Sequence, residues 1–102
     1  MEIETKKLFG ICTAWLISNE IHITSIAVHP LHQKKGLGKS ILSDLIQRSK
    51  SLQTDKIRLE VKDTNEPAKA LYKSLGFEIK TQRSNFYKDG SDAVVLIKDL
   101  TY

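Results

Sequence analysis

The sequence is poor in cysteine and proline and has no long apolar run. Its 102 residues include one cysteine, Cys12, and two prolines. A single cysteine forms no intramolecular disulfide, which excludes a disulfide-stabilised fold. The longest mostly apolar stretch, residues 9–17, is far shorter than the ~20 residues of a membrane-spanning helix, so we predict no membrane segment. The histidines are too few and too scattered to indicate a metal site, and we expect no bound metal; they are His22, His29 and His32.

Charge of one sign does not accumulate along the chain. Lysine and arginine number 16 against 12 aspartate and glutamate, which leaves a formal net charge of +4. The lysines are spread over the whole sequence, and no aromatic residues alternate with the closest basic cluster, at positions 34, 35 and 39. We therefore expect no direct nucleic-acid binding. Residues 1–7 contain no apolar signal-peptide core, so the expected location is the cytoplasm.

The length fits one domain, residues 1–102, and 40% apolar with 27% charged residues is typical of a globular protein. Alternating and helical hydrophobic periodicities then predict the elements. These are, in order, strands at 8–17 and 21–28, a helix from 37 to about 52, a strand at 57–61, a helix from about 66 to 75, and strands at 77–83 and 93–99. The order β-β-α-β-α-β-β indicates an α/β fold with a mixed sheet.

Residues 33–39, Gln-Lys-Lys-Gly-Leu-Gly-Lys, lie between a predicted strand end and a predicted helix start. The first amides of a helix have no internal partner and lie at the positive end of the helix dipole, so an anion fits there. Glycines let the backbone approach a phosphate closely, and lysines add attraction. The spacing predicts a pyrophosphate-binding turn, although such turns are also a frequent structural device. The candidate residues are Gln33, Lys34, Lys35, Gly36, Leu37, Gly38 and Lys39.

Four ordered pieces of the chain together resemble the GCN5-related N-acetyltransferase (GNAT) family. They are Ser-Ile-Ala-Val-His-Pro at 25–30, the turn at 33–39, Leu-Glu-Val at 59–61, and Ala-Leu-Tyr-Lys-Ser-Leu-Gly-Phe at 70–77. The segment Thr-Gln-Arg-Ser-Asn-Phe-Tyr at 81–87 is further similar to the bacterial ribosomal-protein-alanine branch of the family. The resemblance implies an N-terminally truncated GNAT (acyl-CoA N-acyltransferase) fold, without the strand, two helices and strand with which the family begins.

The resemblance also implies an activity, a cosubstrate and site residues. The activity would be direct transfer of an acetyl group from acetyl-CoA to an amine, here a protein or peptide N-terminus, with a ribosomal protein as the candidate acceptor. Glu60 would accept the proton of the attacking amine, and Tyr72 would protonate the departing thiolate. The turn at 33–39 would hold the pyrophosphate, and Asn65 would touch the cosubstrate. Backbone amides of the second strand would pair with the pantetheine; they belong to Ile26, Ala27 and Val28.

Each of these residues also has a purely structural alternative. Glu60 could pair with Arg58 or Lys62 on the same strand face. Tyr72 could belong to the core with its hydroxyl at the rim, and Asn65 could simply cap the second helix. The alternative function is a truncated, non-catalytic domain that binds acetyl-CoA or a partner.

The first predicted strand, at 8–17, is expected to be an unprotected sheet edge, because the family's preceding strand is missing. Exposed edges pair readily with a second chain. We therefore expect that two copies of the chain can form a homodimer through this strand.

Overall fold

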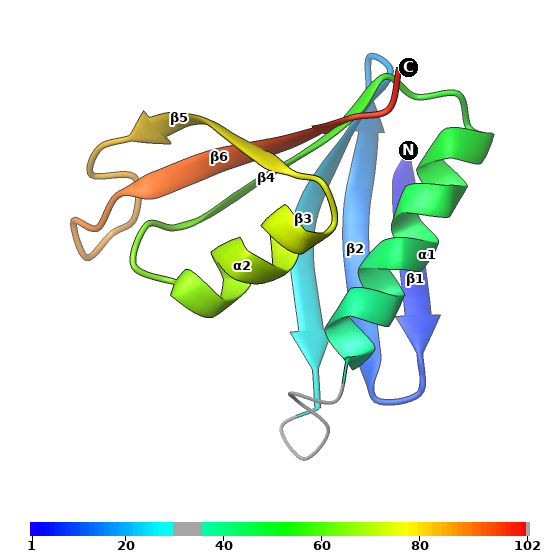
Figure 1. Cartoon of the computed structure of the whole chain (residues 1–102), viewed down its shortest axis with the longest axis horizontal. Helices are drawn as coiled ribbons and strands as arrows, with labels where there is room; N and C mark the ends of the chain where they lie inside the picture. The colour runs from blue at the N-terminus through cyan, green and yellow to red at the C-terminus, as the bar shows by residue number, and fades with distance from the viewer. Residues whose placement is uncertain (30–35, 102) are drawn as a thin grey trace.

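The computed structural model describes residues 1–29 and 36–101. This part of the chain forms strands and helices on a single mixed sheet (Figure 1). In chain order they are β1 (Glu2–Lys7), β2 (Gly10–Ile17), β3 (Glu20–Val28), α1 (Leu37–Ser51), β4 (Lys56–Lys62), α2 (Glu66–Ser74), β5 (Glu78–Arg83) and β6 (Ala93–Asp99). The strand order is β1-β2-β3-β4-β6-β5, and β3 and β4 are the parallel pair. The predicted α/β class with a mixed sheet is confirmed.

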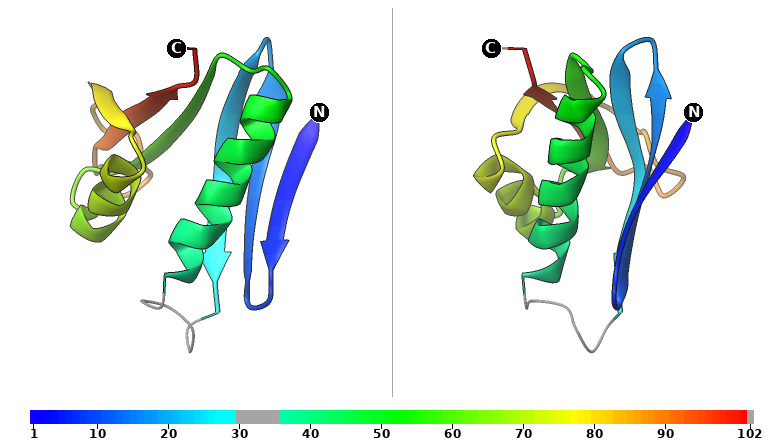
Figure 2. Two further views of the ribbon diagram at one scale, coloured as in Figure 1. Left: turned by 45° about the vertical axis from the view of Figure 1, so that its right-hand side comes forward. Right: turned by 90° about the vertical axis from the view of Figure 1, so that its right-hand side faces the viewer.

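Both helices lie on one face of the sheet, so the core forms between that face and the helices (Figure 2). α1 covers β1, β2 and β3 with an apolar stripe that recurs at helical spacing: Ile41, Leu42, Leu45 and Ile46. The sheet side of this layer includes Ile3, Ala14 and Ile21, each almost fully buried. Among the described residues, no helix is long and apolar enough to span a membrane.

The structure corrects the predicted start of the sheet, because a strand precedes the hairpin. β1 pairs with β2 along its whole length, from Glu2 opposite Trp15 to Lys7 opposite Gly10. The prediction of a first strand at 8–17 was wrong at its beginning, since residues 8–9 form the turn between β1 and β2. The sheet therefore has six strands, and its edge is β1 rather than the strand at 8–17.

β3 changes direction at a β-bulge. Thr13 pairs with Ser25 while its neighbour Ala14 pairs with Ile23, which leaves Thr24 as the extra residue. The extra residue shifts the side-chain alternation by one position. Ile23, before the bulge, is buried in the core, whereas after it Ile26 packs there in part.

β3 and β4 separate soon after they pair. Their parallel pairing is confined to Glu20–His22 on β3 and Lys56–Arg58 on β4. Beyond it the strands diverge, and α2 lies beside the opening (Figures 1 and 2). The second half of β3 thus has a partner strand, β2, on one side only.

Candidate active site

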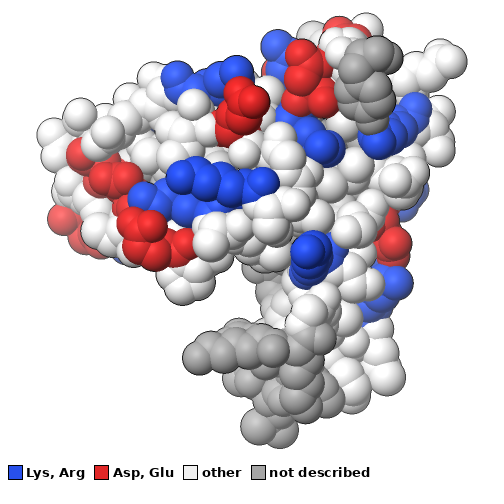
Figure 3. Space-filling model, viewed as in Figure 1, with Lys and Arg blue, Asp and Glu red and all other residues white. Residues whose placement is uncertain are grey.

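A continuous groove occupies the opening between β3 and β4. One cavity, of about 300 Å³, is lined by the diverging parts of both strands and by α2. A second, of about 570 Å³, continues it between α2 and the first turn of α1. The two cavities share Ile26 and Ala68 in their linings, which makes them one groove. Figure 3, seen from the side of the helices, is hollowed below α2 at this place.

The larger cavity ends on the N-terminus of α1. Gly36, Gly38 and Lys39 line it, no side chain of residues 1–29 or 36–101 caps the helix, and its first turn contains no acidic residue. Gly36 has a φ of +77°, a conformation that glycine adopts without steric cost. A Cβ at Gly38 would lie at van der Waals distance from two side chains that line the cavity, 3.8 Å from Cδ2 of Leu71 and 4.0 Å from Cγ2 of Val28. Helix N-terminal amides, a lysine and a bare backbone are the groups that an anion such as a diphosphate requires.

The other residues of the predicted turn are placed differently. The side chain of Leu37 packs against the core, so only its backbone amide is available at the helix end. Three predicted residues lie outside the described part of the chain: Gln33, Lys34 and Lys35.

The predicted strand amides lie along the groove. Ile26, Ala27 and Val28 pair with β2 on one side, while the pairing of β3 with β4 on the other side is confined to Glu20–His22. Alternate backbone groups of an antiparallel strand point to opposite sides, so part of this stretch faces the opening. Ile26 and Val28 also line the larger cavity, whereas Ala27 lines a separate cavity near Lys6 and Phe9.

Glu60 lies on β4 at the smaller cavity, with its carboxylate on the sheet face away from the helices. Its neighbours Leu59 and Val61 alternate to the buried face, as predicted. Arg58 Nε lies 3.7 Å and Arg83 Nη1 4.0 Å from Glu60 Oε1. Both distances exceed a direct hydrogen bond, which leaves the carboxylate able to accept one from a water or an amine.

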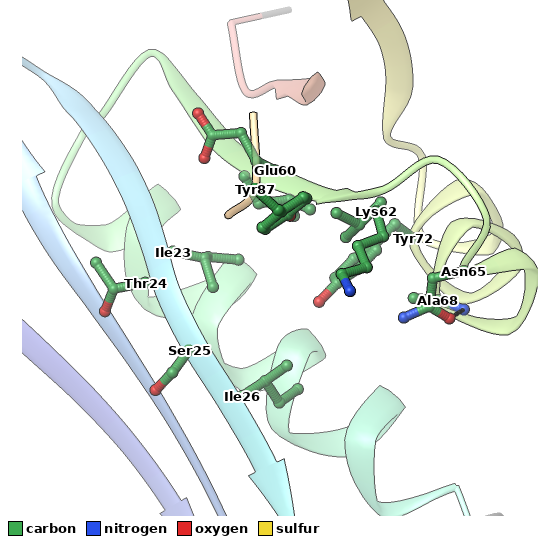
Figure 4. Close-up of a pocket in the computed structure, with 12 residues that line it drawn as sticks. Ile23, Thr24, Ser25, Ile26, Glu60, Lys62, Asn65, Ala68, Tyr72 and Tyr87 are labelled. Carbon is green, nitrogen blue, oxygen red and sulfur yellow. Dashed lines mark hydrogen bonds between the residues drawn. The ribbon is translucent and has the colours of Figure 1, made fainter. Parts of the chain in front are cut away.

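Tyr72 approaches the same cavity from α2 (Figure 4). Its side chain is 4% exposed, and its ring packs edge to face on Phe77 at 5.6 Å. Burial, with a smaller contribution from Cys12, raises the pKa of Tyr72 to about 12. The phenol of Tyr72 therefore stays protonated at neutral pH and can donate a hydrogen bond. Burial likewise raises the pKa of the Cys12 thiol to about 11, which makes it a poor nucleophile.

Asn65 caps α2 and also lies at the smaller cavity. Its side-chain oxygen accepts a hydrogen bond from the amide of Ala68 at 3.2 Å, which caps α2, and the residue also lines the smaller cavity. Pro67 lies in the first turn of this helix, and Gly76, with a φ of +94°, lies just beyond its last turn.

Sequence reasoning missed several lining residues. They include Thr24 and Ser25 on β3, whose hydroxyls point away from β4 and bond to Thr13 of β2, and also Lys62 on β4 and Tyr87 from the β5–β6 loop (Figure 4). Two adjacent polar residues within an apolar strand were the available signal for the bulge that exposes Thr24 and Ser25. Tyr87 lies in the segment 81–87, which showed only a resemblance to a branch of the GNAT family and carried no predicted role. Among the described residues, no group of three or more His, Cys, Asp or Glu side chains is arranged to hold a metal ion.

Comparisons with known proteins show which family this chain resembles. A family model described as "Acetyltransferase (GNAT) family" matches residues 2–77. The putative [ribosomal protein bS18]-alanine N-acetyltransferase of Bacillus subtilis is 32% identical over 90 residues, covering 87% of this chain and 60% of that protein. The [ribosomal protein bS18]-alanine N-acetyltransferase of Escherichia coli K12 is 36% identical over 93 residues, covering 88% of this chain and 63% of that protein.

Solved structures give the same result for the fold. The ribosomal-protein-S18-alanine N-acetyltransferase from Escherichia coli superposes with a TM-score of 0.85 at 33% identity, covering 91% of this chain and 62% of that one. A Bacillus subtilis acetyltransferase in complex with CoA gives 0.84 at 28% identity, covering 93% and 71%. The chain thus spans about three fifths of the length of the Bacillus subtilis and Escherichia coli alanine N-acetyltransferases that it matches. Because the family model covers more than half of its residues, this chain belongs to the acetyltransferase (GNAT) family.

Proposed function

We propose that this protein binds acetyl-CoA and transfers the acetyl group directly to an amine, the α-amine of a protein N-terminus. One observation carries the proposal: a single groove joins an uncapped helix N-terminus to a carboxylate and a buried phenol. The names of the relatives, which refer to alanine N-acetyltransferases of a ribosomal protein, support a protein N-terminus as acceptor, with a ribosomal protein as the first candidate.

The helix end would hold the diphosphate of acetyl-CoA. Amides of Gly36, Leu37 and Gly38 at the start of α1 donate hydrogen bonds to phosphate oxygens, and Lys39 adds a positive charge. Gln33, Lys34 and Lys35 belong to the same proposed turn. Backbone amides of β3 at Ile26, Ala27 and Val28 would bind the pantetheine arm and polarise the thioester carbonyl, since Ile26 and Val28 line the larger cavity.

Glu60 and Tyr72 would handle the protons at the other end. Glu60 would accept a proton from the attacking amine, through a water, because neither arginine lies within hydrogen-bond distance of Glu60 Oε1. An α-amine, with an ordinary pKa of ~7.7–8.0, yields its proton more easily than a lysine at ~10.4. Asn65 fixes the start of α2 and so the position of Tyr72.

Proton transfer from Tyr72 to the leaving sulfur depends on the difference between their pKa values. With a pKa of about 12, the phenol is a weaker acid than an ordinary thiol at ~8.5 by ~3.5 units, or ~5 kcal/mol. Tyr72 would therefore first donate a hydrogen bond to the departing sulfur and give up its proton as negative charge develops there.

The test uses acetyl-CoA, a set of peptides with free N-termini, and mass detection of the acetylated products. Glu60→Gln and Tyr72→Phe are expected to lower turnover by ~10²–10⁴ while acetyl-CoA affinity, measured by calorimetry, stays unchanged. Glu78→Gln is the matched control, because Glu78 is an exposed carboxylate on β5 away from the groove. Full activity in both Glu60→Gln and Tyr72→Phe would overturn the assignment of roles.

The second candidate is a non-catalytic domain that binds acetyl-CoA or a partner protein. The chain matches about three fifths of the length of the two alanine N-acetyltransferases named above. The same assay separates the two functions. Calorimetric binding of acetyl-CoA without acetylation of any peptide would select the binding domain.

Three further proposals concern surroundings and assembly. We propose a cytoplasmic location and no direct nucleic-acid binding; in support of the latter, basic and acidic side chains are interspersed on the face shown in Figure 3.

The proposed homodimer would pair β1 of two copies, since β1 is the edge strand. Alternating charges on β1, such as Glu4 and Lys6, weaken such pairing. Light scattering that gives a monomer mass at high micromolar concentration would exclude the dimer.

A further inference from the structure

The β5–β6 loop folds back on itself and is attached to the end of β4. Within it, the amide of Tyr87 donates to the carbonyl of Ser91 at 3.2 Å, and the amide of Gly90 donates to the carbonyl of Tyr87 at 2.9 Å. At its far end, the carbonyl of Asp92 accepts a hydrogen bond from the amide of Asp63 at 3.0 Å. The loop is thus a small closed unit with one backbone attachment to β4.

Asp89 supplies a second attachment, made by side chains. Its Oδ2 accepts a hydrogen bond from Lys62 Nζ at 2.9 Å, and its Oδ1 accepts bonds from the amide and hydroxyl of Ser91 at 2.9 and 2.6 Å. The Ser91 hydroxyl, followed by the Lys62 ammonium, holds the pKa of Asp89 well below its usual range. The carboxylate therefore stays ionised, and the ion pair persists, throughout the pH range of an assay.

Lys62 connects this attachment to the groove. It lies on β4 two residues beyond Glu60 and lines the smaller cavity. Its ammonium lies 5.5 Å from the centre of the Tyr87 ring, within cation–π range, and Tyr87 lines the same cavity (Figure 4). Tyr87 is therefore held beside Glu60 by a chain of contacts that begins at Asp89.

We propose that Lys62 and Asp89 are positioning residues that fix Tyr87 as a wall of the acceptor side of the active site. The inference rests on the proposed acetyltransferase function. The pair lies on the side of the smaller cavity that carries Glu60, whereas the proposed diphosphate site lies at the far end of the larger cavity. Loss of the pair therefore affects the acceptor and leaves acetyl-CoA binding unchanged.

The ion pair has little effect on global stability, which makes it accessible to mutation. The Lys62 and Asp89 side chains are 46% and 57% exposed, and such surface pairs contribute little to folding. Lys62→Met removes the ammonium but keeps the apolar stem. Lys62→Arg restores a cation that can both pair with Asp89 and stack on Tyr87.

The first readout needs no cosubstrate. In ¹⁵N relaxation of the free protein, Lys62→Met and Asp89→Asn are expected to lower the amide order parameters of residues 86–91 from about 0.85 toward 0.6, and Lys62→Arg is expected to leave them as in the wild type. Asp99→Asn is the matched control, because Asp99 also accepts bonds from the amide and hydroxyl of a residue two positions on, Thr101, but has no link to the groove. Unchanged order parameters in Lys62→Met and Asp89→Asn would overturn the proposal.

The second readout is kinetic. Both disruptive variants are expected to raise the acceptor KM roughly tenfold, within the ~10²-fold that a 1 Å misplacement can produce, with acetyl-CoA affinity unchanged and Lys62→Arg close to wild type. Wild-type acceptor KM in both variants would contradict the proposed role of the pair. Absence of acetylation by the wild-type protein would instead contradict the proposed function, and the relaxation result then still decides whether the pair orders the loop.

Discussion

Substitution of Gly38 by alanine separates cosubstrate binding from folding, because it is expected to move them in opposite directions. Gly38 is the second residue of α1 and has no positive φ, so alanine adopts its backbone conformation without strain. The added methyl group would lie 3.8 Å from Leu71 Cδ2 and 4.0 Å from Val28 Cγ2, which are ordinary van der Waals distances. The fold therefore accommodates the change.

The expected effect on stability is neutral to favourable. Alanine is more favourable than glycine within a helix by up to ~1 kcal/mol, which corresponds to a rise in Tm of roughly 4–8 °C in a domain of this size. Gly38 lies in the first turn of α1, so the gain is at most this value.

The expected effect on acetyl-CoA binding is unfavourable. Gly38 lines the larger cavity, and its Cβ would occupy the space through which a diphosphate approaches the helix amides. Overpacking of one methyl group costs ~1–3 kcal/mol, which corresponds to a Kd weaker by roughly 5- to 150-fold. Gly38→Val adds two more carbons at the same place and is expected to weaken binding further.

Calorimetric titration with acetyl-CoA and thermal unfolding of the same samples provide the assay. Gln47→Ala is the control, because Gln47 is exposed on α1 outside the cavity lining and its substitution is expected to leave the Kd unchanged. A Gly38→Ala protein that folds and binds acetyl-CoA with wild-type affinity would refute the assignment of this helix end to the diphosphate.

Three other perturbations test the structure elsewhere. Asn65→Ala removes the cap of α2 and is expected to lower the free energy of unfolding by ~0.5–2 kcal/mol in urea, whereas Asn65→Asp retains it; equal stability of the two variants would contradict the cap. Thr5→Val is expected to stabilise the protein by ~1–3 kcal/mol in the same experiment, because Thr5 Oγ1 is buried with no hydrogen-bond partner in the described part of the chain; a destabilised variant would show that the hydroxyl has one. The raised pKa of Tyr72 favours the neutral phenol in the folded state, so a contribution of ~3 kcal/mol is complete below pH ~10 and is lost as the pH rises to about 12. Wild-type protein should thus lose stability more steeply than Tyr72→Phe across that window, and parallel curves would argue against a buried phenol.

The parts of the fold that depend on local pattern could be predicted from the sequence. The stripe on α1, the alternation on β4 and the cap and stop of α2 each follow from residues a few positions apart. These elements also fixed the positions of Glu60 and Tyr72, since alternation directs Glu60 away from the core and the helical stripe directs Tyr72 toward it.

β1 could not be predicted in this way. It buries one apolar side chain, Ile3, and a threonine, Thr5, among charged residues, so its local pattern is weak. Contacts distant in sequence stabilise it instead: it pairs with β2, Arg48 of α1 donates a hydrogen bond to the carbonyl of Glu4 at 2.7 Å, and Lys7 pairs with Asp44 at 2.9 Å.

The far wall of the groove also depends on tertiary contacts. Tyr87 lines the cavity from a loop that returns to β4. There Asp89 pairs with Lys62, 27 residues away in the sequence, and the carbonyl of Asp92 accepts a bond from the amide of Asp63. The exposure of Thr24 requires a bulge whose register is set by β2. No periodicity within a single segment encodes either arrangement.

A nuclear magnetic resonance titration of ¹⁵N-labelled protein with acetyl-CoA tests the central claim most directly, because it reports where the molecule binds. We expect the amide signals of Gly36, Gly38 and Lys39 to shift together with those of Ile26 and Asn65, along the whole groove. An absence of shifts at saturating acetyl-CoA, or shifts confined to the separate cavity around Lys6 and Phe9, would contradict the account.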